Sequence, residues 1–362
     1  MSNEIRAGSR QRLDHLPAVI AHRGASKAAP EHTLAAYRRA IEEGADGLEC
    51  DVRLTADGHL VCVHDRRVNR TSNGRGAVSA LELADLAALD FGSWMDRHAD
   101  PYEAPDSALD TDAADTPGGT ADPVGTPESP ESPESTEDHD RRCARAPVRR
   151  STAGRSGPAE HPGTAEPLGT SEHLGAAEHL GAAGRLGAAG RLGVAADPES
   201  TSVLTLDRLL TLVAEAPRPV ELAIETKHPT RWAGQVEERL LELLDRHRLR
   251  TPVRIMSFSA RSLQRVRVAA PDIPTVLLTQ FLLPRHRDGR LPYGVRTVGP
   301  SIRILRTHPE YVARAHRAGH EVHVWTVDEP EDVELCMRLG VDAIITNRPR
   351  QVRAQLRRGL AG

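Results

Sequence analysis

The chain has 362 residues, a formal net charge of −4 and a sequence pI near 6.5. This small negative charge gives no electrostatic reason to expect a nucleic-acid partner. The sequence contains no run of about 18 apolar residues, so we expect no stable insertion into a membrane.

Residues 1–17 form a polar N-terminal tail in our interpretation, because they are charged and lack an apolar core of signal-peptide length. The four cysteines are scattered and form no CxxC pair, which is typical of reduced thiols. We therefore expect a cytoplasmic protein.

The middle of the chain has a different composition. From Asp100 to Ser202 it consists mainly of Pro, Gly, Ala, Ser, Thr and charged residues, with six-residue repeats from Gly163 to Leu192. Such a segment buries too little apolar surface to offset its ordering entropy, so we predict a disordered low-complexity insertion at 100–202. Without it about 260 residues are left, close to the ~250 of one (β/α)₈ barrel.

The first predicted part of the barrel, 18–99, begins with a strand at Ala18–Ala21. A helix with apolar residues at helical spacing follows at Thr33–Ile41, and Gly44 is its expected C-cap. Strands are predicted at Gly47–Val52 and Leu60–Val63, joined by the turn Thr55–Gly58. We expect these two strands to form a hairpin in which Glu49 lies opposite His64 and Asp51 lies opposite Cys62.

The second predicted part of the barrel is 203–352, followed by a C-terminal tail at 353–362. Helices are expected at Leu204–Ala214, Thr230–His247 and Ser262–Ala269, and strands at Val220–Glu225, Val253–Phe258, Thr275–Leu278, Arg296–Val298, Glu321–Trp325 and Asp342–Ile345. Alternating strands and helices predict an α/β protein with a parallel sheet. Nine strands are predicted for the eight places of a TIM-type barrel, so we expect the surplus strand in the hairpin.

Ionisable residues gather at the ends of several of these strands: His22-Arg23, Glu49 and Asp51, His64, and Glu225 with Lys227. The carboxyl ends of the strands of a parallel barrel meet on one face, where catalytic groups lie. We therefore expect these residues to converge.

The residue types indicate their chemistry. Carboxylates such as Glu49, Asp51 and Glu225 suit Mg²⁺ or Ca²⁺, and cations such as Arg23 and Lys227 suit an anionic phosphodiester. His22 and His64 could transfer protons near neutral pH. Each motif alone is more often a core histidine, a solvated face or a structural ion pair than a functional site. Their common position at strand ends nevertheless favours metal-assisted phosphoryl transfer.

The sequence resembles the glycerophosphodiester phosphodiesterase family. The matching stretches are Ile20–Gly24, Pro30–Leu34, Gly44–Val52, Thr55–Gly58, Val63–Asp65, Gly74–Gly76, Leu206–Leu210, Ile224–Lys227, Val324–Asp328 and Gly340–Pro349. The resemblance implies a TIM barrel that splits a small glycerophosphodiester into glycerol 3-phosphate and an alcohol. It also implies roles in glycerol and lipid metabolism.

The resemblance implies roles for single residues as well. His22 and His64 correspond to the acid/base pair, Glu49, Asp51 and Glu225 to the ligands of a divalent cation, and Arg23 and Lys227 to phosphate contacts. Trp325 corresponds to a pocket wall, although a buried core tryptophan explains it equally well.

Two features depart from the family pattern: His32 replaces its usual Asn, and the insertion replaces a smaller cap. The preferred alcohol, the oligomeric state and the role of the insertion are not predicted. Two alternatives stay open, a phospholipase C-like or sphingomyelinase D-like lipid phosphodiesterase and a non-catalytic binding protein on the same fold.

Overall fold

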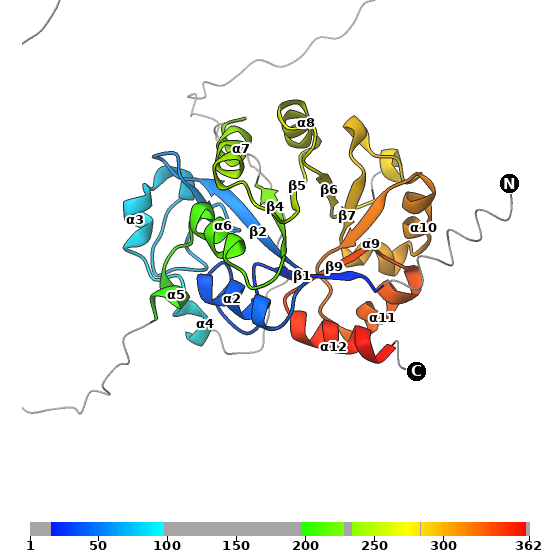
Figure 1. The fold of residues 1–362 in the computed structure, drawn as a ribbon, viewed down its shortest axis with the longest axis horizontal. Coiled ribbons are helices and arrows are strands. Elements are labelled where there is room, and N and C mark those ends of the chain that lie inside the picture. Colours follow the sequence, from blue (N-terminus) through cyan, green and yellow to red (C-terminus); the bar gives the residue numbers. More distant parts are fainter. Residues whose placement is uncertain (1–15, 98–196, 228–233, 283, 360–362) are drawn as a thin grey trace, which may run out of the picture. The chain divides into compact units, whose positions relative to one another are not determined.

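The computed structural model describes residues 16–97, 197–227, 234–282 and 284–359 (Figure 1). These residues contain one sheet of nine strands, ordered β1-β9-β8-β7-β6-β5-β4-β2-β3 and closed by the pairing of β1 with β2. The strands are β1 (Ala18–His22), β2 (Gly47–Leu54), β3 (Leu60–Cys62), β4 (Glu221–Thr226), β5 (Val253–Ser257), β6 (Thr275–Thr279), β7 (Thr297–Pro300), β8 (Glu321–Val324) and β9 (Ala343–Thr346). All neighbours pair in parallel except β2 and β3. The closed eight-stranded TIM-type barrel is therefore confirmed, with β3 as the surplus strand.

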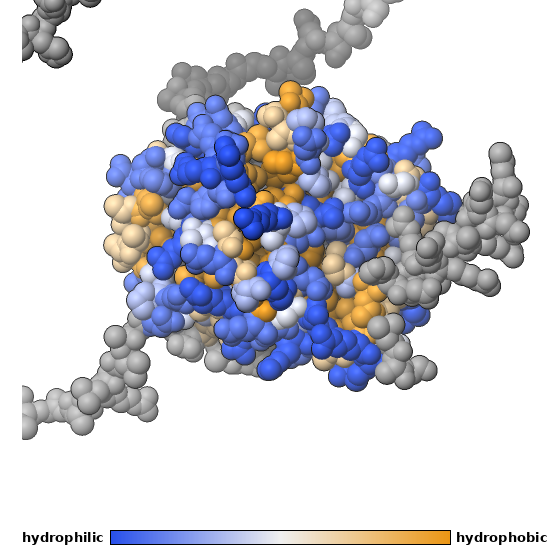
Figure 2. All heavy atoms as spheres, in the orientation of Figure 1, coloured by the Kyte–Doolittle hydropathy of each residue, from blue (hydrophilic) through white to orange (hydrophobic). Residues whose placement is uncertain are grey.

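Helices surround this barrel within the described residues. They are α2 (Leu34–Glu42), α3 (Leu83–Ala87), α4 (Trp94–Arg97), α5 (Pro198–Thr201), α6 (Leu206–Ala214), α7 (Gln235–His247), α8 (Ala260–Ala269), α9 (Ile302–Thr307), α10 (Glu310–Arg317), α11 (Pro330–Leu339) and α12 (Pro349–Gly359), with 3₁₀ turns η1 (Val78–Ala80), η2 (Pro284–His286) and η3 (Pro292–Gly294). None of these helices has the length and apolar character needed to cross a bilayer. On the face shown in Figure 2, hydrophilic residues cover most of the surface, with smaller apolar areas between them.

Side chains fill the barrel interior. The interior cluster contains Ile20, Ala223, Met256, Val276, Leu278, Ala343 and Ile345. Two larger clusters lie where helices pack on the sheet, and strands such as β4 and β6 are therefore buried along nearly their whole length. Because the barrel is packed rather than hollow, substrate access is confined to its rims.

Side-chain caps define where several helices begin. The hydroxyls of Thr33, Thr205 and Ser259 accept hydrogen bonds from the first turns of α2, α6 and α8. Gly44 follows α2 with φ +84°, the left-handed conformation that favours glycine after a helix. The predicted ends of α2 are thus confirmed to within a residue or two.

The predicted register of the β2–β3 hairpin is wrong by one residue. Val52, and not Asp51, lies opposite Cys62. The loop has three residues rather than two, because the Thr55 N–H bonds the His59 carbonyl and Gly58 takes φ +85°. Asp51 consequently lies beside Val63, whose N–H donates to the Asp51 carbonyl at 3.1 Å.

Two predicted segment boundaries change. Most of the predicted N-terminal tail and most of the predicted insertion, 100–202, lie outside the described residues. The end of that insertion is folded, because Asp197 caps the short helix α5. The predicted C-terminal tail from 353 is wrong as far as Gly359, because α12 buries Val352 and Leu356, four residues apart, against the barrel.

Candidate active site

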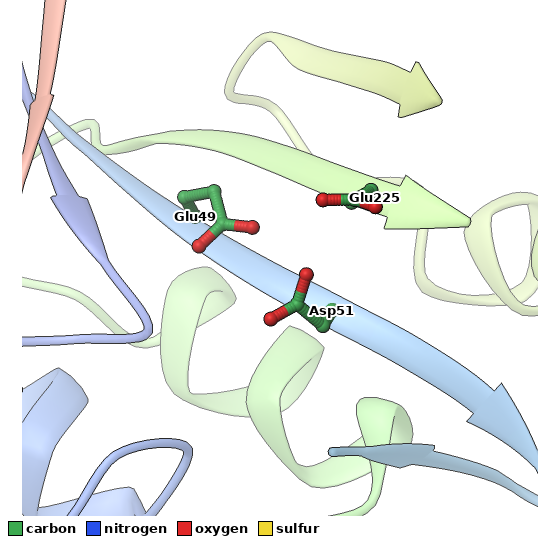
Figure 3. A group of neighbouring side chains, drawn as sticks. All are labelled: Glu49, Asp51 and Glu225. Carbon is green, nitrogen blue, oxygen red and sulfur yellow. The ribbon is translucent and has the colours of Figure 1, made fainter. Parts of the chain in front are cut away.

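Three acidic side chains meet on the neighbouring strands β2 and β4 (Figure 3). Glu49 and Asp51 are two residues apart on β2, so they share a face, and Asp51 lies opposite Glu225 of β4. One oxygen of each carboxylate lies within 4.8 Å of the others. Their relative exposures are only 1%, 1% and 6%. The structure thus brings the three predicted metal ligands into one buried cluster.

Two cations border this cluster. Lys227 Nζ lies 2.9 Å from Asp51 Oδ1 and 2.9 Å from Glu225 Oε1. Arg23 Nε lies 3.2 Å from Asp51 Oδ2. Arg23 has φ +57° and Gly24 has φ +85°. A Cβ atom on residue 24 would lie only 2.7 Å from Ala36. This tight left-handed turn after β1 therefore requires a glycine.

If all three carboxylates were ionised, their negative charge would exceed the positive charge of Arg23 and Lys227. Burial and the charge of Asp51 raise the pKa of Glu49 well above its usual value, and burial raises the pKa of Glu225 to about 7. Burial also opposes ionisation of Asp51, yet the charges of Lys227 and Arg23 hold its pKa well below the usual range. A buried cluster of oxygen donors with this excess charge fits a hard divalent cation.

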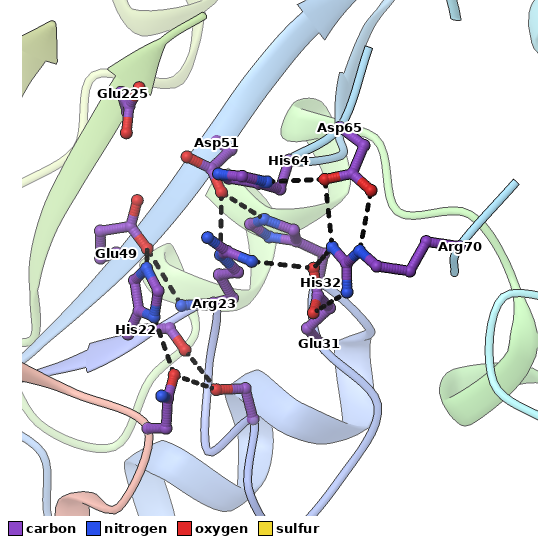
Figure 4. A network of polar contacts seen from close by, with 12 residues as sticks. His22, Arg23, Glu31, His32, Glu49, Asp51, His64, Asp65, Arg70 and Glu225 are labelled. Atoms are coloured by element: carbon purple, nitrogen blue, oxygen red, sulfur yellow. Dashed lines mark hydrogen bonds and ion pairs between the residues drawn. The ribbon is translucent and has the colours of Figure 1, made fainter. Parts of the chain in front are cut away.

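His22 ends β1 and lies beside Glu49 (Figure 4). Asn347 orients its ring. The Asn347 amide nitrogen donates to Asp328 Oδ2 at 2.6 Å, so its oxygen faces His22 Nδ1 at 2.7 Å and accepts from it. Nδ1 therefore carries the proton in neutral His22. The lone pair belongs to Nε2, which lies 4.0 Å from Glu49 Oε2.

His64 follows β3 and is oriented by its neighbour in sequence. Its Nδ1 donates to Asp65 Oδ1 at 2.7 Å, which again leaves the lone pair on Nε2. Burial and the charges of Arg23 and Lys227 lower the pKa of His64 to about 4. The two histidines thus have the same tautomer, although they come from different strands.

His32, which stands in the position of the family's usual Asn, donates to the carboxylate cluster. Its Nε2 lies 2.8 Å from Asp51 Oδ2, and its Nδ1 lies 2.8 Å from the Tyr37 hydroxyl. Because Asp51 is ionised, His32 donates to it through Nε2. The Tyr37 hydroxyl beside Nδ1 also lies 3.1 Å from the Glu49 carbonyl oxygen, to which it donates. Replacement of Asn by His therefore still provides a hydrogen-bond donor to Asp51.

Sequence reasoning assigned no role to several residues that complete this site. Asp65, Asn347 and Asp328 orient the two histidines, and Glu31 and Arg70 connect Arg23 with Asp65. All of these except Arg70 lie in stretches that carry the family resemblance, so the signal was present. Arg70 follows the His64-Asp65 motif by a few residues and had no signal of its own.

Trp325 lies at the mouth of the barrel. Its Nε1 donates to the Gly299 carbonyl at 2.7 Å, and its ring packs against the interior cluster. The ring of Phe258, which is 44% exposed, meets it edge-on at 5.4 Å. This half-buried position suits a pocket wall, and contact with a substrate stays a prediction.

Comparison with known proteins supports the same interpretation. The sequence model described as the glycerophosphoryl diester phosphodiesterase family matches residues 22–151 and 172–351. A Mycobacterium tuberculosis protein named "Probable glycerophosphodiester phosphodiesterase 1" is 36% identical over 354 residues, 95% of this chain and 94% of the relative. A glycerophosphodiester phosphodiesterase of Caldanaerobacter subterraneus is 27% identical over 94% of this chain and 98% of the relative.

Solved structures share the fold. A phosphodiesterase of Oleispira antarctica, in complex with the product sn-glycerol 3-phosphate, has a TM-score of 0.61 at 17% identity and covers 94% of this chain and 97% of its own. A glycerophosphodiester phosphodiesterase of Agrobacterium tumefaciens has a TM-score of 0.57 at 19% identity, covering 94% and 100%. At such identities the likeness establishes the barrel fold.

Proposed function

The chain belongs to the glycerophosphoryl diester phosphodiesterase family, and we propose that it hydrolyses a glycerophosphodiester to glycerol 3-phosphate and an alcohol at the site just described. It is thus a phosphoric diester hydrolase. The substrate class is supported by the names of the relatives and by the product bound in the Oleispira structure. Hydrolysis of this substrate would place the enzyme in glycerol and lipid metabolism.

Glu49, Asp51 and Glu225 are the proposed ligands of the divalent cation. Mg²⁺ and Ca²⁺ both accept carboxylate oxygens, and three of them leave coordination positions for water and substrate. When bound, the cation would polarise the phosphoryl oxygens. Arg23 and Lys227, which border the same carboxylates, would bind the negative phosphodiester and stabilise the charge that develops on it.

His22 and His64 are the proposed acid/base pair. One accepts the proton of the attacking hydroxyl, for which we propose the glycerol 2-hydroxyl, and the other donates a proton to the leaving alcohol. The phosphorus–oxygen bond to the alcohol breaks as a cyclic phosphate forms, and water then opens the cycle. Both rings present a basic Nε2 when neutral, because Asn347 and Asp65 hold their Nδ1 protons.

We also propose that the enzyme is cytoplasmic. Cys50, Cys62 and Cys336 are free and buried, which suits a reducing compartment.

The observation that carries the function is the buried carboxylate cluster between two similarly oriented histidines. We would measure glycerol 3-phosphate release from glycerophosphocholine and glycerophosphoethanolamine, with and without chelator. Wild type should release it only with metal, and Glu49→Ala should not. Glu215→Ala, which removes an exposed carboxylate after α6, is the matched control. Chelator-resistant release, or full activity of Glu49→Ala, would contradict the proposal.

A further inference from the structure

Arg70, in the segment after β3, lies between two carboxylates (Figure 4). Its Nη1 and Nη2 donate to the two oxygens of Glu31 at 2.8 and 2.7 Å. Its Nε donates to Asp65 Oδ2 at 2.8 Å, and Nη2 lies 3.3 Å from Asp65 Oδ1. A planar guanidinium thus makes two forked contacts at once, which a lysine ammonium cannot reproduce.

Each carboxylate also contacts a residue of the proposed chemistry. Glu31 Oε1 accepts from Arg23 Nη1 at 3.1 Å, and Asp65 Oδ1 accepts from His64 Nδ1 at 2.7 Å. Arg70 therefore completes a continuous chain of charged contacts from Arg23 to His64. These two groups come from different segments, one after β1 and one after β3. The backbone of each segment bonds β2, whereas the Arg23 and His64 side chains are connected through Glu31, Arg70 and Asp65.

The electrostatics favour a fixed arrangement. Burial opposes ionisation of Glu31, yet Arg23 and Arg70 hold its pKa well below the usual value. Burial likewise opposes ionisation of Asp65, whose pKa is lowered by the hydrogen bonds from His64 and Arg70. Without Arg70, each carboxylate would lose a guanidinium donor, and Asp65 could rotate away from the His64 Nδ1 proton.

We propose that Arg70 is a positioning residue for phosphodiester cleavage, which fixes the orientation of His64 through Asp65 and of Arg23 through Glu31. The inference rests on the proposed function, because it requires His64 to transfer protons and Arg23 to bind phosphate. A residue that only fastened two surface segments together would contribute to stability and leave the rate of the chemical step unchanged.

The chain offers a matched control in Arg254, at the amino end of β5. Arg254 also binds two carboxylates: Nη1 donates to Glu321 Oε2 at 2.9 Å, and Nε donates to Glu221 Oε1. Arg254→Met therefore removes the same kind of double ion pair from the opposite end of the barrel. We would compare it with Arg70→Met and Arg70→Lys in kcat, KM and thermal unfolding.

We expect Arg70→Met and Arg70→Lys to lower kcat by about 10–100-fold, the usual effect of losing a residue that orients a functional group. KM should change less than kcat, and Arg254→Met should keep wild-type kcat. Guanidinium added to Arg70→Ala should restore part of the lost kcat, whereas ammonium should not. If Arg70→Met does not fold, Arg70→Lys provides the same comparison with the charge retained.

Wild-type kcat in Arg70→Lys, or equal losses of kcat in Arg70→Met and Arg254→Met, would overturn the inference about Arg70 and leave the proposed function intact. Absence of glycerol 3-phosphate release by the wild-type enzyme would instead overturn the proposed function, and the inference with it.

Discussion

At the amino ends of the barrel strands, Arg254 lies between Glu221 and Glu321; at the carboxyl ends, Arg70 lies between Glu31 and Asp65. Both guanidinium groups bind two carboxylates. The Arg254 side chain is 20% exposed and that of Arg70 is 42% exposed, so burial alone would make Arg254 the more important contact.

The two arginine sites differ in the groups that their carboxylates contact besides the arginine. Glu321 contacts Thr297 and His323, so the contacts of Arg254 end within regular strands and hold those strands together. Glu31 and Asp65 instead contact Arg23 and His64, which face the carboxylate cluster. In a TIM barrel, residues at the amino ends of the strands are expected to stabilise the fold, and residues at the carboxyl ends are expected to take part in the chemistry.

We expect the largest loss of kcat when either histidine at the carboxyl rim is replaced. General acid–base groups contribute about 10²–10⁴-fold to rates, so His22→Ala and His64→Ala should each lower kcat by at least the smaller factor. Steady-state release of glycerol 3-phosphate by folded, metal-loaded variants measures this. His247→Ala, in which a histidine paired with Asp207 at the end of α7 is removed, serves as the control. Near-normal turnover of either site variant would disprove its assigned role.

A smaller effect is expected at the amino rim, and it concerns stability. The hydrogen bond with His323 and the charge of Arg254 lower the pKa of Glu321 from 4.5 to about 2, although burial opposes this. Because the folded-state pKa is depressed, ionised Glu321 stabilises the fold fully above pH 4.5, and this contribution is lost as pH falls towards 2.

Glu321→Gln lacks this contribution at every pH. Its melting temperature should therefore lie below that of wild type at neutral pH, and the two should converge between pH 4.5 and 2. Thermal unfolding measured across this range provides the check, and kcat at neutral pH should be unchanged. A gap that stays constant on acidification would show that the carboxylate charge is not responsible.

The smallest effect is expected from His32→Asn. His32 has φ +59°, a left-handed conformation that Asn tolerates well, and an Asn amide can still donate to Asp51. Loss of the Tyr37 contact should cost no more than a single net hydrogen bond, or about tenfold in kcat. His32→Leu, which removes the donor to Asp51, should be clearly worse in kcat and in metal dependence. Equal kinetics for the Asn and Leu variants would show that this donor is unimportant.

Much of the barrel could be predicted because its strands are short apolar runs that alternate with amphipathic helices. The hairpin register could not, because it depends on whether the loop from Thr55 to His59 contains two or three residues. The helix α12 was missed for a different reason: after the buried Pro349 at its start, Val352 and Leu356 mark its buried face, among many arginines. Whether a segment with such a narrow apolar stripe forms a helix depends on the surface against which it packs.

The carboxylate cluster was predictable in the same way, since the two-residue spacing of Glu49 and Asp51 fixes their common face. The orienting contacts were not. Asn347 reaches His22 across more than three hundred residues of sequence, and Arg70 reaches Glu31 across thirty-nine. Such contacts depend on barrel closure and on loop conformation, neither of which has a local sequence pattern.

The pairing of β1 with β9 sets the order in which this protein can become active during synthesis. Chains emerge from the ribosome N-terminal end first, so β1 and β2 exist long before β9. Until β9 arrives, β1 has an open edge and His22 has no Asn347 to hold its ring. From the proposed role of His22, we therefore expect hydrolytic activity only after nearly the whole polypeptide is made, and we expect a chain shortened before β9 to be inactive and prone to aggregate through that edge.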